Sequence, residues 1–161
     1  MDKILNWINK NINDSKTLNE NDIPNVLAFS LLWNMFESLF CDKYANMCKI
    51  NDSIDKHIDL LEEEKYQKIF EYFYDRYKND DNKLNALNLR KPQKSLVKKV
   101  LDESFTDKNN KLKFIMAIIY RFRNNLFHGE KQLLKLKYQE ENFNNANQFL
   151  MYFIENCRRG L

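Results

Sequence analysis

The sequence predicts an all-α protein, and three features of its composition and patterning support this prediction. The 161 residues include only two glycines and two prolines, too few for the many tight turns of a sheet-rich fold. Hydrophobic residues make up 43% of the chain, which suits a packed core and not a disordered chain. Apolar residues recur at helical spacing along most of its length. We expect a single domain, residues 1–161, with about five to six helices around a four-helix-bundle-like core.

Charge and targeting features point to a cytoplasmic protein. The net charge of +3 permits binding to a polyanion such as RNA without requiring it. The N-terminal residues lack the basic, apolar and small-residue pattern of a secretory signal, and no apolar run is long enough to cross a bilayer. We therefore expect a protein of the cytoplasm with no membrane segment.

The cysteines and the known catalytic motifs argue against a metal or a cofactor. Cys41, Cys48 and Cys157 include no Cys-x-x-Cys pair of the kind that binds zinc. Cys41 and Cys48 lie a heptad apart on one predicted helix, too far along it for a comfortable disulfide, so buried free thiols are expected. The chain also lacks a glycine-rich phosphate loop, a His-Glu-x-x-His pair and a Gly-x-Ser-x-Gly turn.

Two helices are predicted in the first third of the chain. One covers residues 2–10, and the Asp22 and Pro24 pair is typical of the start of a second. The second helix extends to about Cys48 and is apolar on most sides, so it belongs in a core or at an interface. Glu37 is the one charge within its apolar stretch.

A third helix, about residues 52–77, keeps its apolar residues at helical spacing. His57 lies on this helix among isoleucines and leucines, and a lone histidine in such a place is usually structural or simply exposed. Residues 79–82 form a turn. Three leucines then indicate that the following connection packs onto the core: Leu84, Leu87 and Leu89.

A basic helix over residues 92–103 and a final helix over residues 138–158 complete the framework on either side of the motif described next. In the basic helix Val97 and Val100 face the core and leave the lysines outside. Lys98 and Lys99 are thereby candidate contacts to a phosphate backbone. A solvated lysine face without a ligand is the alternative.

The stretch Tyr120–Gly129, at the end of another predicted helix, gathers the scarce residues Arg121, Arg123 and His128. On a regular helix Arg121, Asn124 and His128 lie within an arc of roughly 60°. Arg123 lies about 140° round from His128, so one straight helix cannot aim both side chains at the same atom. Either the last turn unwinds, or a second copy of the chain supplies the missing partner.

The run Arg123–Gly129 resembles the Arg-x4-6-His motif of the HEPN superfamily (higher eukaryotes and prokaryotes nucleotide-binding), and the glycine after the histidine is most similar to the ApeA-like branch. The resemblance implies a small helical bundle that forms a homodimer with paired motifs at the interface. Many members are metal-independent endoribonucleases of toxin–antitoxin, abortive-infection or CRISPR-linked defence systems, whereas others have lost activity. It also implies that Glu37 holds an arginine of the motif; a solvated edge glutamate is the alternative.

Metal-independent RNA cleavage needs proton transfer and positive charge where the phosphorane forms. His128 suits proton transfer because its imidazole titrates near neutrality, and Arg123 can bind the phosphate in its fork. Asn124 can orient the ring or the substrate, with Arg121 and Lys131 as further phosphate contacts. One histidine per chain is too few for both acid and base, so a homodimer is expected, with a 2′,3′-cyclic phosphate as product.

Two alternatives stand beside this hypothesis. Arg, His and Gly at the end of a helix also suit plain C-terminal capping. The chain could equally be a non-catalytic helical module that binds RNA, a nucleotide or a partner protein. A cognate antitoxin or defence partner is a further expected partner. Relatives paired with a nucleotidyltransferase often carry Tyr two residues after the His, whereas this chain has Glu130, which argues against regulation by modification of such a tyrosine.

Overall fold

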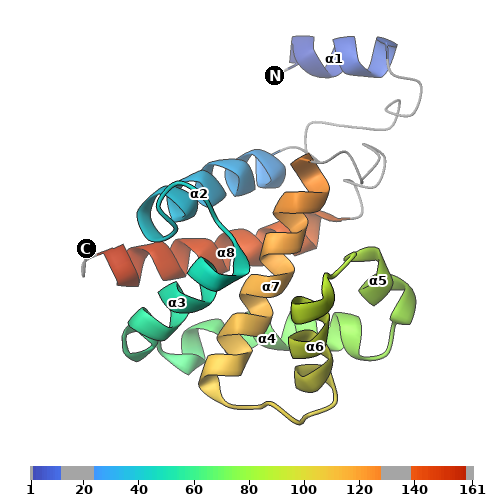
Figure 1. Cartoon of the computed structure of the whole chain (residues 1–161). Coiled ribbons are helices and arrows are strands. Elements are labelled where there is room, and N and C mark those ends of the chain that lie inside the picture. Colours follow the sequence, from blue (N-terminus) through green and yellow to red (C-terminus); the bar gives the residue numbers. More distant parts are fainter. Residues whose placement is uncertain (1, 12–23, 128–138, 159–161) are drawn as a thin grey trace.

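The computed structural model describes residues 2–11, 24–127 and 139–158, and its regular elements in these ranges are all helical (Figure 1). The all-α bundle predicted from the sequence is confirmed. In chain order the elements are α1 (Asp2–Asn11), α2 (Pro24–Phe40), α3 (Met47–His57), a 3-10 turn (Ile58–Leu60), α4 (Glu63–Lys78), α5 (Asp81–Ala86), α6 (Lys91–Leu101), α7 (Lys108–Phe127) and α8 (Glu140–Cys157).

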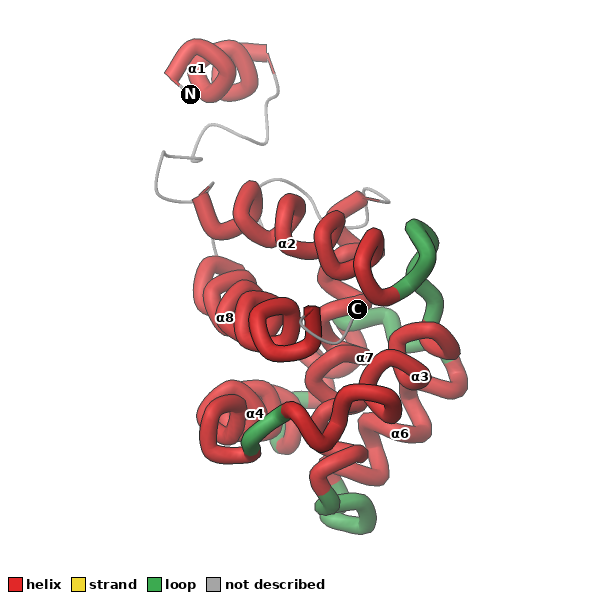
Figure 2. The backbone as a smooth tube through the Cα atoms, turned by 90° about the vertical axis from the view of Figure 1, so that its left-hand side faces the viewer, coloured by secondary structure: helices red, strands yellow, loops and turns green. Residues whose placement is uncertain are grey.

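Helix α7 is the central element of the bundle. Helices α2, α8 and α4 are stacked in that order, and α7 runs across this stack (Figures 1 and 2). Helices α3, α6 and α4 all pack against α7. The last turns of α7, which carry Arg121 and Arg123, therefore project from a helix that is held from several sides.

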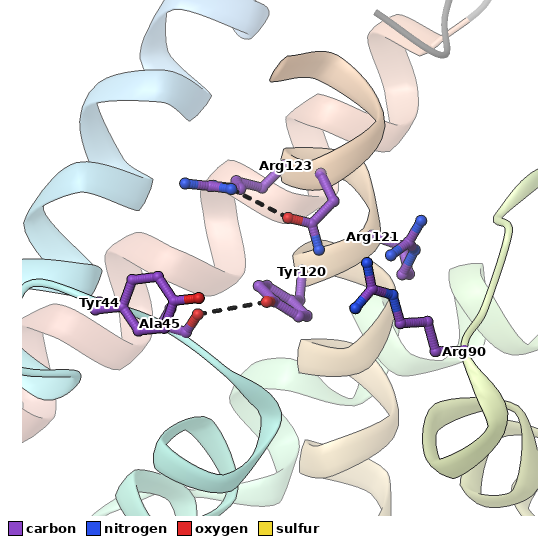
Figure 3. Close-up of a pocket in the computed structure, with 7 residues that line it drawn as sticks. Tyr44, Ala45, Arg90, Tyr120, Arg121 and Arg123 are labelled. Carbon is purple, nitrogen blue, oxygen red and sulfur yellow. Dashed lines mark hydrogen bonds between the residues drawn. The ribbon is translucent and has the colours of Figure 1, made fainter. Parts of the chain in front are cut away.

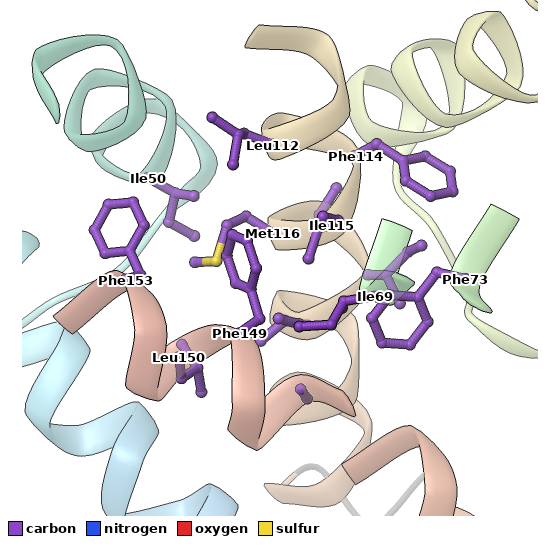
Figure 4. Packing of buried hydrophobic residues seen from close by; sticks show 14 of the residues in the cluster. Ile50, Ile69, Phe73, Leu112, Phe114, Ile115, Met116, Phe149, Leu150 and Phe153 are labelled. Carbon is purple, nitrogen blue, oxygen red and sulfur yellow. The ribbon is translucent and has the colours of Figure 1, made fainter. Parts of the chain in front are cut away.

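The central position of α7 follows from its sequence. Residues 114–119 are fully buried without interruption, because this run is apolar around the whole helix and not only along one stripe. Figure 4 shows Met116 of α7 among side chains from neighbouring helices, including Ile50 of α3 and Phe149 of α8. Each large side chain buried in this way contributes about 1.5–3 kcal/mol to folding, so α7 is anchored firmly.

Two predicted helix boundaries were wrong in the first half of the chain. The helix expected to reach Cys48 ends at Phe40, and α3 begins at Met47. Asn46 caps α3, because its side-chain oxygen accepts a hydrogen bond from the Lys49 amide at 3.0 Å. The helix expected over residues 52–77 is divided into α3 and α4 by the 3-10 turn and Leu61, which is buried in an extended conformation.

The connection after α4 also differs from the predicted turn. Asp80 accepts a hydrogen bond from the Lys83 amide at 2.9 Å and so caps the short helix α5. This helix and the division of residues 52–77 account for the difference between six predicted helices and the eight α-helices in the described part of the chain. The leucines of this connection do pack down: Leu87 is buried, and Leu84 and Leu89 are partly buried.

His57, the one histidine among the described residues, has a structural role, as predicted. His57 is buried, its Nδ1 lies 2.8 Å from the carbonyl oxygen of Ser53, and its ring packs edge-on against Phe40 and Phe153. The cysteines agree with prediction in part. Cys41 and Cys157 are buried free thiols, whereas Cys48 is exposed. Cys48 lies in the first turn of α3, and not on the buried face of one continuous helix as expected.

No helix in the described ranges combines the length and the apolar character needed to span a bilayer.

Candidate functional site

The last turns of α7 carry two arginines that differ in burial and in direction. Arg121 is only 4% exposed, whereas Arg123 is partly exposed. Helical geometry separates the two by about 200° around the axis, so one points toward the α5–α6 connection and the other toward α2 (Figure 3). The pair therefore cannot act as two equivalent cations.

Arg121 holds the end of α5 in place. Its Nε donates to the carbonyl oxygen of Leu87 at 3.1 Å, and its Nη2 donates to Asn125 Oδ1 at 3.0 Å. Asn125 Nδ2 donates to the same Leu87 carbonyl at 3.2 Å. The predicted role of Arg121 as a phosphate contact is untested, and these bonds give it a structural role as well.

A pocket of about 510 Å³ opens beside these turns (Figure 3). Its described lining combines three arginines, two tyrosines, an asparagine and an alanine: Arg90, Arg121, Arg123, Tyr44, Tyr120, Asn124 and Ala45. No carboxylate is among these described lining residues. A lining that contains three guanidinium groups favours an anionic ligand such as a phosphate.

Arg123 and Asn124 form the upper edge of the pocket. Arg123 Nη1 donates to Asn124 Oδ1 at 3.1 Å, so the two candidate residues are in direct contact. Below them the Tyr120 ring stacks on Trp33 of α2 with centroids 5.8 Å apart, and the Tyr120 hydroxyl donates to the Ala45 carbonyl at 3.3 Å. These contacts fix the floor of the pocket to α2 and to the loop that follows it.

Glu37 supports that loop. Its Oε1 accepts a hydrogen bond from the Ala45 amide at 2.8 Å, and the Ala45 carbonyl in turn receives the hydroxyl of Tyr120. Glu37 is half-buried, so it is not a freely solvated edge residue. That Glu37 holds an arginine of the motif stays a prediction. The carboxylate of Glu37 contacts the backbone of Ala45, which lines the pocket.

Arg90 enters the pocket from the opposite side. It precedes α6, and its backbone amide donates to the Oε1 of Gln93, which is buried, at 3.1 Å. Lys98 and Lys99 are exposed, as predicted, but they do not line the pocket. They lie eight and nine residues beyond Arg90, or about 12–14 Å along the helix, and Lys99 covers the Phe105 ring at 4.7 Å.

Two of the predicted site residues, His128 and Lys131, lie outside the described residues. Of the others, Arg121, Arg123 and Asn124 share one pocket, and Lys98 and Lys99 lie apart from it. In the described part of the chain no group of three or more His, Cys, Asp or Glu residues is placed to hold a metal ion.

Sequence reasoning missed Tyr44, Tyr120 and Arg90 as members of the site. Arg90 lies just before the predicted basic helix, and nothing near Tyr44 marks it in the sequence. The three come from separate segments that the fold brings together. The sequence predicts Tyr44 near the end of a long helix, but it lies in the loop between α2 and α3. Its place in the site therefore becomes visible only once the ends of these two helices are known.

Comparisons of the chain with protein-family models, with curated proteins and with solved structures find no match. The chemistry of the pocket-lining residues is therefore the main guide to function.

Proposed function

We propose that this protein is a metal-independent endoribonuclease of the HEPN type, with Arg123, Asn124 and His128 as its catalytic residues. The observation that carries the proposal is the arginine pocket at the end of α7, directly before His128 in the chain. The pocket would bind the scissile phosphate of RNA. Arg123 would stabilise the negative charge of the phosphorane, because a guanidinium keeps its charge at every stage of the reaction.

Proton transfer is assigned to His128. The 2′-hydroxyl must lose a proton as it attacks, and the leaving 5′-oxygen must gain one. Asn124 lines the pocket and precedes His128 by four residues in the chain, so we assign it the orientation of the ring or the RNA. The products would be a 2′,3′-cyclic phosphate and a free 5′-hydroxyl, with Lys131 as a further phosphate contact.

A homodimer would supply a second His128, so that one imidazole acts as base and the other as acid. An apolar stripe along α2 supports self-association. Leu27, Leu31, Met35 and Leu39 recur every four residues along it, and each is at least 40% exposed. Because soluble monomers rarely expose a continuous apolar stripe, such a surface usually marks a protein contact. Helix α2 also packs beside the Arg123 side of the pocket (Figure 3).

A cleavage assay tests the proposal. The purified protein is incubated with end-labelled single-stranded RNA in EDTA, and the products are resolved and checked for 2′,3′-cyclic phosphate ends. We expect cleavage by the wild type and a loss of at least about a hundredfold in His128→Ala and Arg123→Ala, since acid–base groups contribute factors of about 10²–10⁴. Lys68→Ala, an exposed cation on α4, is the matched control. Undiminished cleavage by His128→Ala would overturn the assignment.

A second candidate is a non-catalytic module that binds RNA, a nucleotide or a partner protein. One observation favours it: the described lining of the pocket holds arginines, tyrosines and an asparagine, groups that bind anions but do not ordinarily exchange protons at neutral pH. Binding of RNA without any cleavage in the same assay would select this function.

We place this activity in the cytoplasm, where RNA is available, as part of a toxin–antitoxin or antiphage defence system. An unrestrained endoribonuclease harms its host, so a cognate antitoxin or defence partner belongs to the proposal. The Glu130 position favours a partner that acts by binding over one that modifies a tyrosine. Growth arrest on expression of the wild type, relieved in His128→Ala, is the expected result.

A further inference from the structure

Tyr44 stands at the mouth of the arginine pocket with 70% of its surface exposed. It belongs to the loop of residues 41–46 between α2 and α3. In Figure 3 its ring lies opposite Arg90, with Tyr120 between them, and below Arg123. An aromatic ring left open to solvent in a pocket lined by guanidinium groups is the arrangement that proteins use to bind single-stranded nucleic acid.

The loop that carries Tyr44 is held rigidly. The Tyr44 amide donates to the Cys41 carbonyl at 3.0 Å, and the Lys43 amide donates to the Glu37 carbonyl at 3.1 Å. On the other side of Tyr44, the Ala45 amide donates to the Glu37 carboxylate at 2.8 Å. Backbone bonds on both sides of Tyr44 fix its position, so a ligand that uses the ring finds it already in place.

The loop also contains backbone strain. Asp42 and Lys43 have φ values of 47° and 63°, a left-handed conformation that costs a residue other than glycine about 1–2 kcal/mol. Two successive residues in the left-handed conformation, both charged and neither of them glycine, are unusual in a simple connection. Residues in strained conformations cluster at ligand-binding sites, where the surrounding structure holds them.

We infer that Tyr44 is a base-stacking platform, and that the pocket binds one nucleotide with its base on the Tyr44 ring and its phosphate between Arg90 and Arg123. The inference rests on the proposed function and names its substrate class: RNA that is unpaired at the bound nucleotide. A paired base in an A-form helix is stacked between its neighbours and cannot present its face to a tyrosine.

A protein partner is the competing explanation for an exposed tyrosine. The apolar stripe of α2 ends near this loop, and Tyr44 could extend that contact surface. The charge of the pocket decides in favour of RNA, because Tyr44 shares its cavity with three arginines and with no described carboxylate. A strand of RNA brings phosphates to these cations, whereas an apolar protein surface brings no anion.

Binding of an RNA that cannot be cleaved tests the inference separately from catalysis. The probe is a fluorescent 2′-O-methyl single strand of about ten nucleotides, a typical site size, together with single strands that each lack one base and with the matching duplex. Affinities are measured by anisotropy for the wild type, Tyr44→Ala, Tyr44→Leu and Tyr44→Trp. Leu60→Ala is the control, because Leu60 is also exposed but lies on the 3-10 turn.

We expect Tyr44→Ala and Tyr44→Leu to bind the single strand about tenfold more weakly, as the loss of one base–aromatic stack does. Tyr44→Trp should stay within about twofold of the wild type. Removal of the stacked base should weaken the wild type and leave Tyr44→Ala unaffected, and the duplex should bind more weakly than the single strand.

Equal affinity of Tyr44→Ala and the wild type for the single strand overturns the base platform but leaves the nuclease proposal standing. Single-strand binding that depends on Tyr44 but survives in a protein that never cleaves RNA overturns the nuclease and keeps the platform. A Tyr44→Leu variant that binds like the wild type, or a Tyr44→Ala variant that only changes self-association, would assign the ring to a protein contact instead.

Discussion

Arg121 donates a hydrogen bond to the carbonyl oxygen of Leu87, 3.1 Å away, from inside the bundle. Leu87 follows the last residue of α5, where backbone carbonyls have no partner within the helix. A cation at this end of a helix satisfies those carbonyls and complements the helix dipole. Three residues later the chain reaches Arg90 in the pocket, so the bond from Arg121 to Leu87 anchors the segment that leads to Arg90.

Arg121 and Arg123 should therefore differ in their effect on stability. Arg121→Ala removes a buried guanidinium from Leu87 and Asn125, and we expect it to lower the free energy of unfolding by about 2–3 kcal/mol. Arg123→Ala, on the partly exposed side of the helix, should cost less than about 1 kcal/mol. Urea unfolding followed by circular dichroism measures both. Equal losses in the two variants would contradict the structural role of Arg121.

Arg90 and the lysines of α6 should differ in RNA binding. Because Arg90 lines the pocket and Lys98 does not, we expect Arg90→Ala to weaken binding of single-stranded RNA. It should also reduce the slope of log affinity against log salt by about 0.7, the value for one phosphate contact. Lys98→Ala and Lys99→Ala serve as matched controls and should leave the slope nearly unchanged. If the lysine variants weakened RNA binding more than Arg90→Ala does, the RNA would bind along α6 and not in the pocket.

The apolar stripe of α2 should be the contact between two copies of the chain. Leu31 is 69% exposed at its centre, so we expect Leu31→Glu to convert a dimer to a monomer and to abolish cleavage without unfolding the bundle. Light scattering over a range of concentrations measures the oligomeric state. Leu60→Glu places the same charge at an exposed leucine elsewhere and should leave the dimer intact. A wild type that is monomeric throughout would remove the paired catalytic site from the proposal.

Helix α7 illustrates what the sequence could predict. Its apolar run is unambiguous, and Asp107 caps its first turn by accepting a hydrogen bond from the Asn110 amide at 3.0 Å. The loop of residues 41–46 illustrates what it could not. No glycine or proline marks that loop, because Asp42 and Lys43 adopt the left-handed conformation themselves. Apolar residues continue on both sides, so the pattern resembles one long helix.

The candidate site was predictable only where it lies along one helix. Spacing along α7 correctly placed Arg121 and Arg123 on different sides, but it could not show which of them is buried. That distinction depends on Leu87, which reaches Arg121 from 34 residues away in the chain. Tyr44 and Arg90 likewise enter the pocket through tertiary packing, which no local pattern in the sequence encodes.

The three thiols should react at very different rates. Burial raises the pKa of Cys41 to about 12, with a further contribution from Glu37, and burial raises the pKa of Cys157 to about 11. Cys48 is exposed. Because the thiolate is the reactive form, we expect one thiol per chain to react rapidly with Ellman's reagent under native conditions. All three should react in denaturant, and Cys48→Ser should remove the rapid phase. A rapid phase that persists in Cys48→Ser would contradict the packing of the other two.

The link between α3 and α7 should make a small, pH-dependent contribution to stability. The Lys113 ammonium, 2.7 Å from the Asp55 carboxylate, lowers the pKa of that carboxyl, and Asn109 lowers it further. A carboxyl whose pKa is lower in the folded state stabilises the fold above its ordinary value of 3.8. The contribution is lost as the pH falls through the lower, folded value.

Asp55→Asn should therefore reduce the free energy of unfolding at pH 7 by less than about 1 kcal/mol, because half of the Asp55 side chain is exposed and water screens the pair. The difference from wild type should vanish once the pH has fallen below the lowered pKa of the folded state, where the carboxyl of the wild type is protonated. Thermal unfolding from pH 2 to pH 7 measures this dependence. Asp59→Asn, at an exposed position on the neighbouring 3-10 turn, should show little change at any pH. An Asp55→Asn deficit that persists at pH 2 would mean that the carboxylate charge is not its cause.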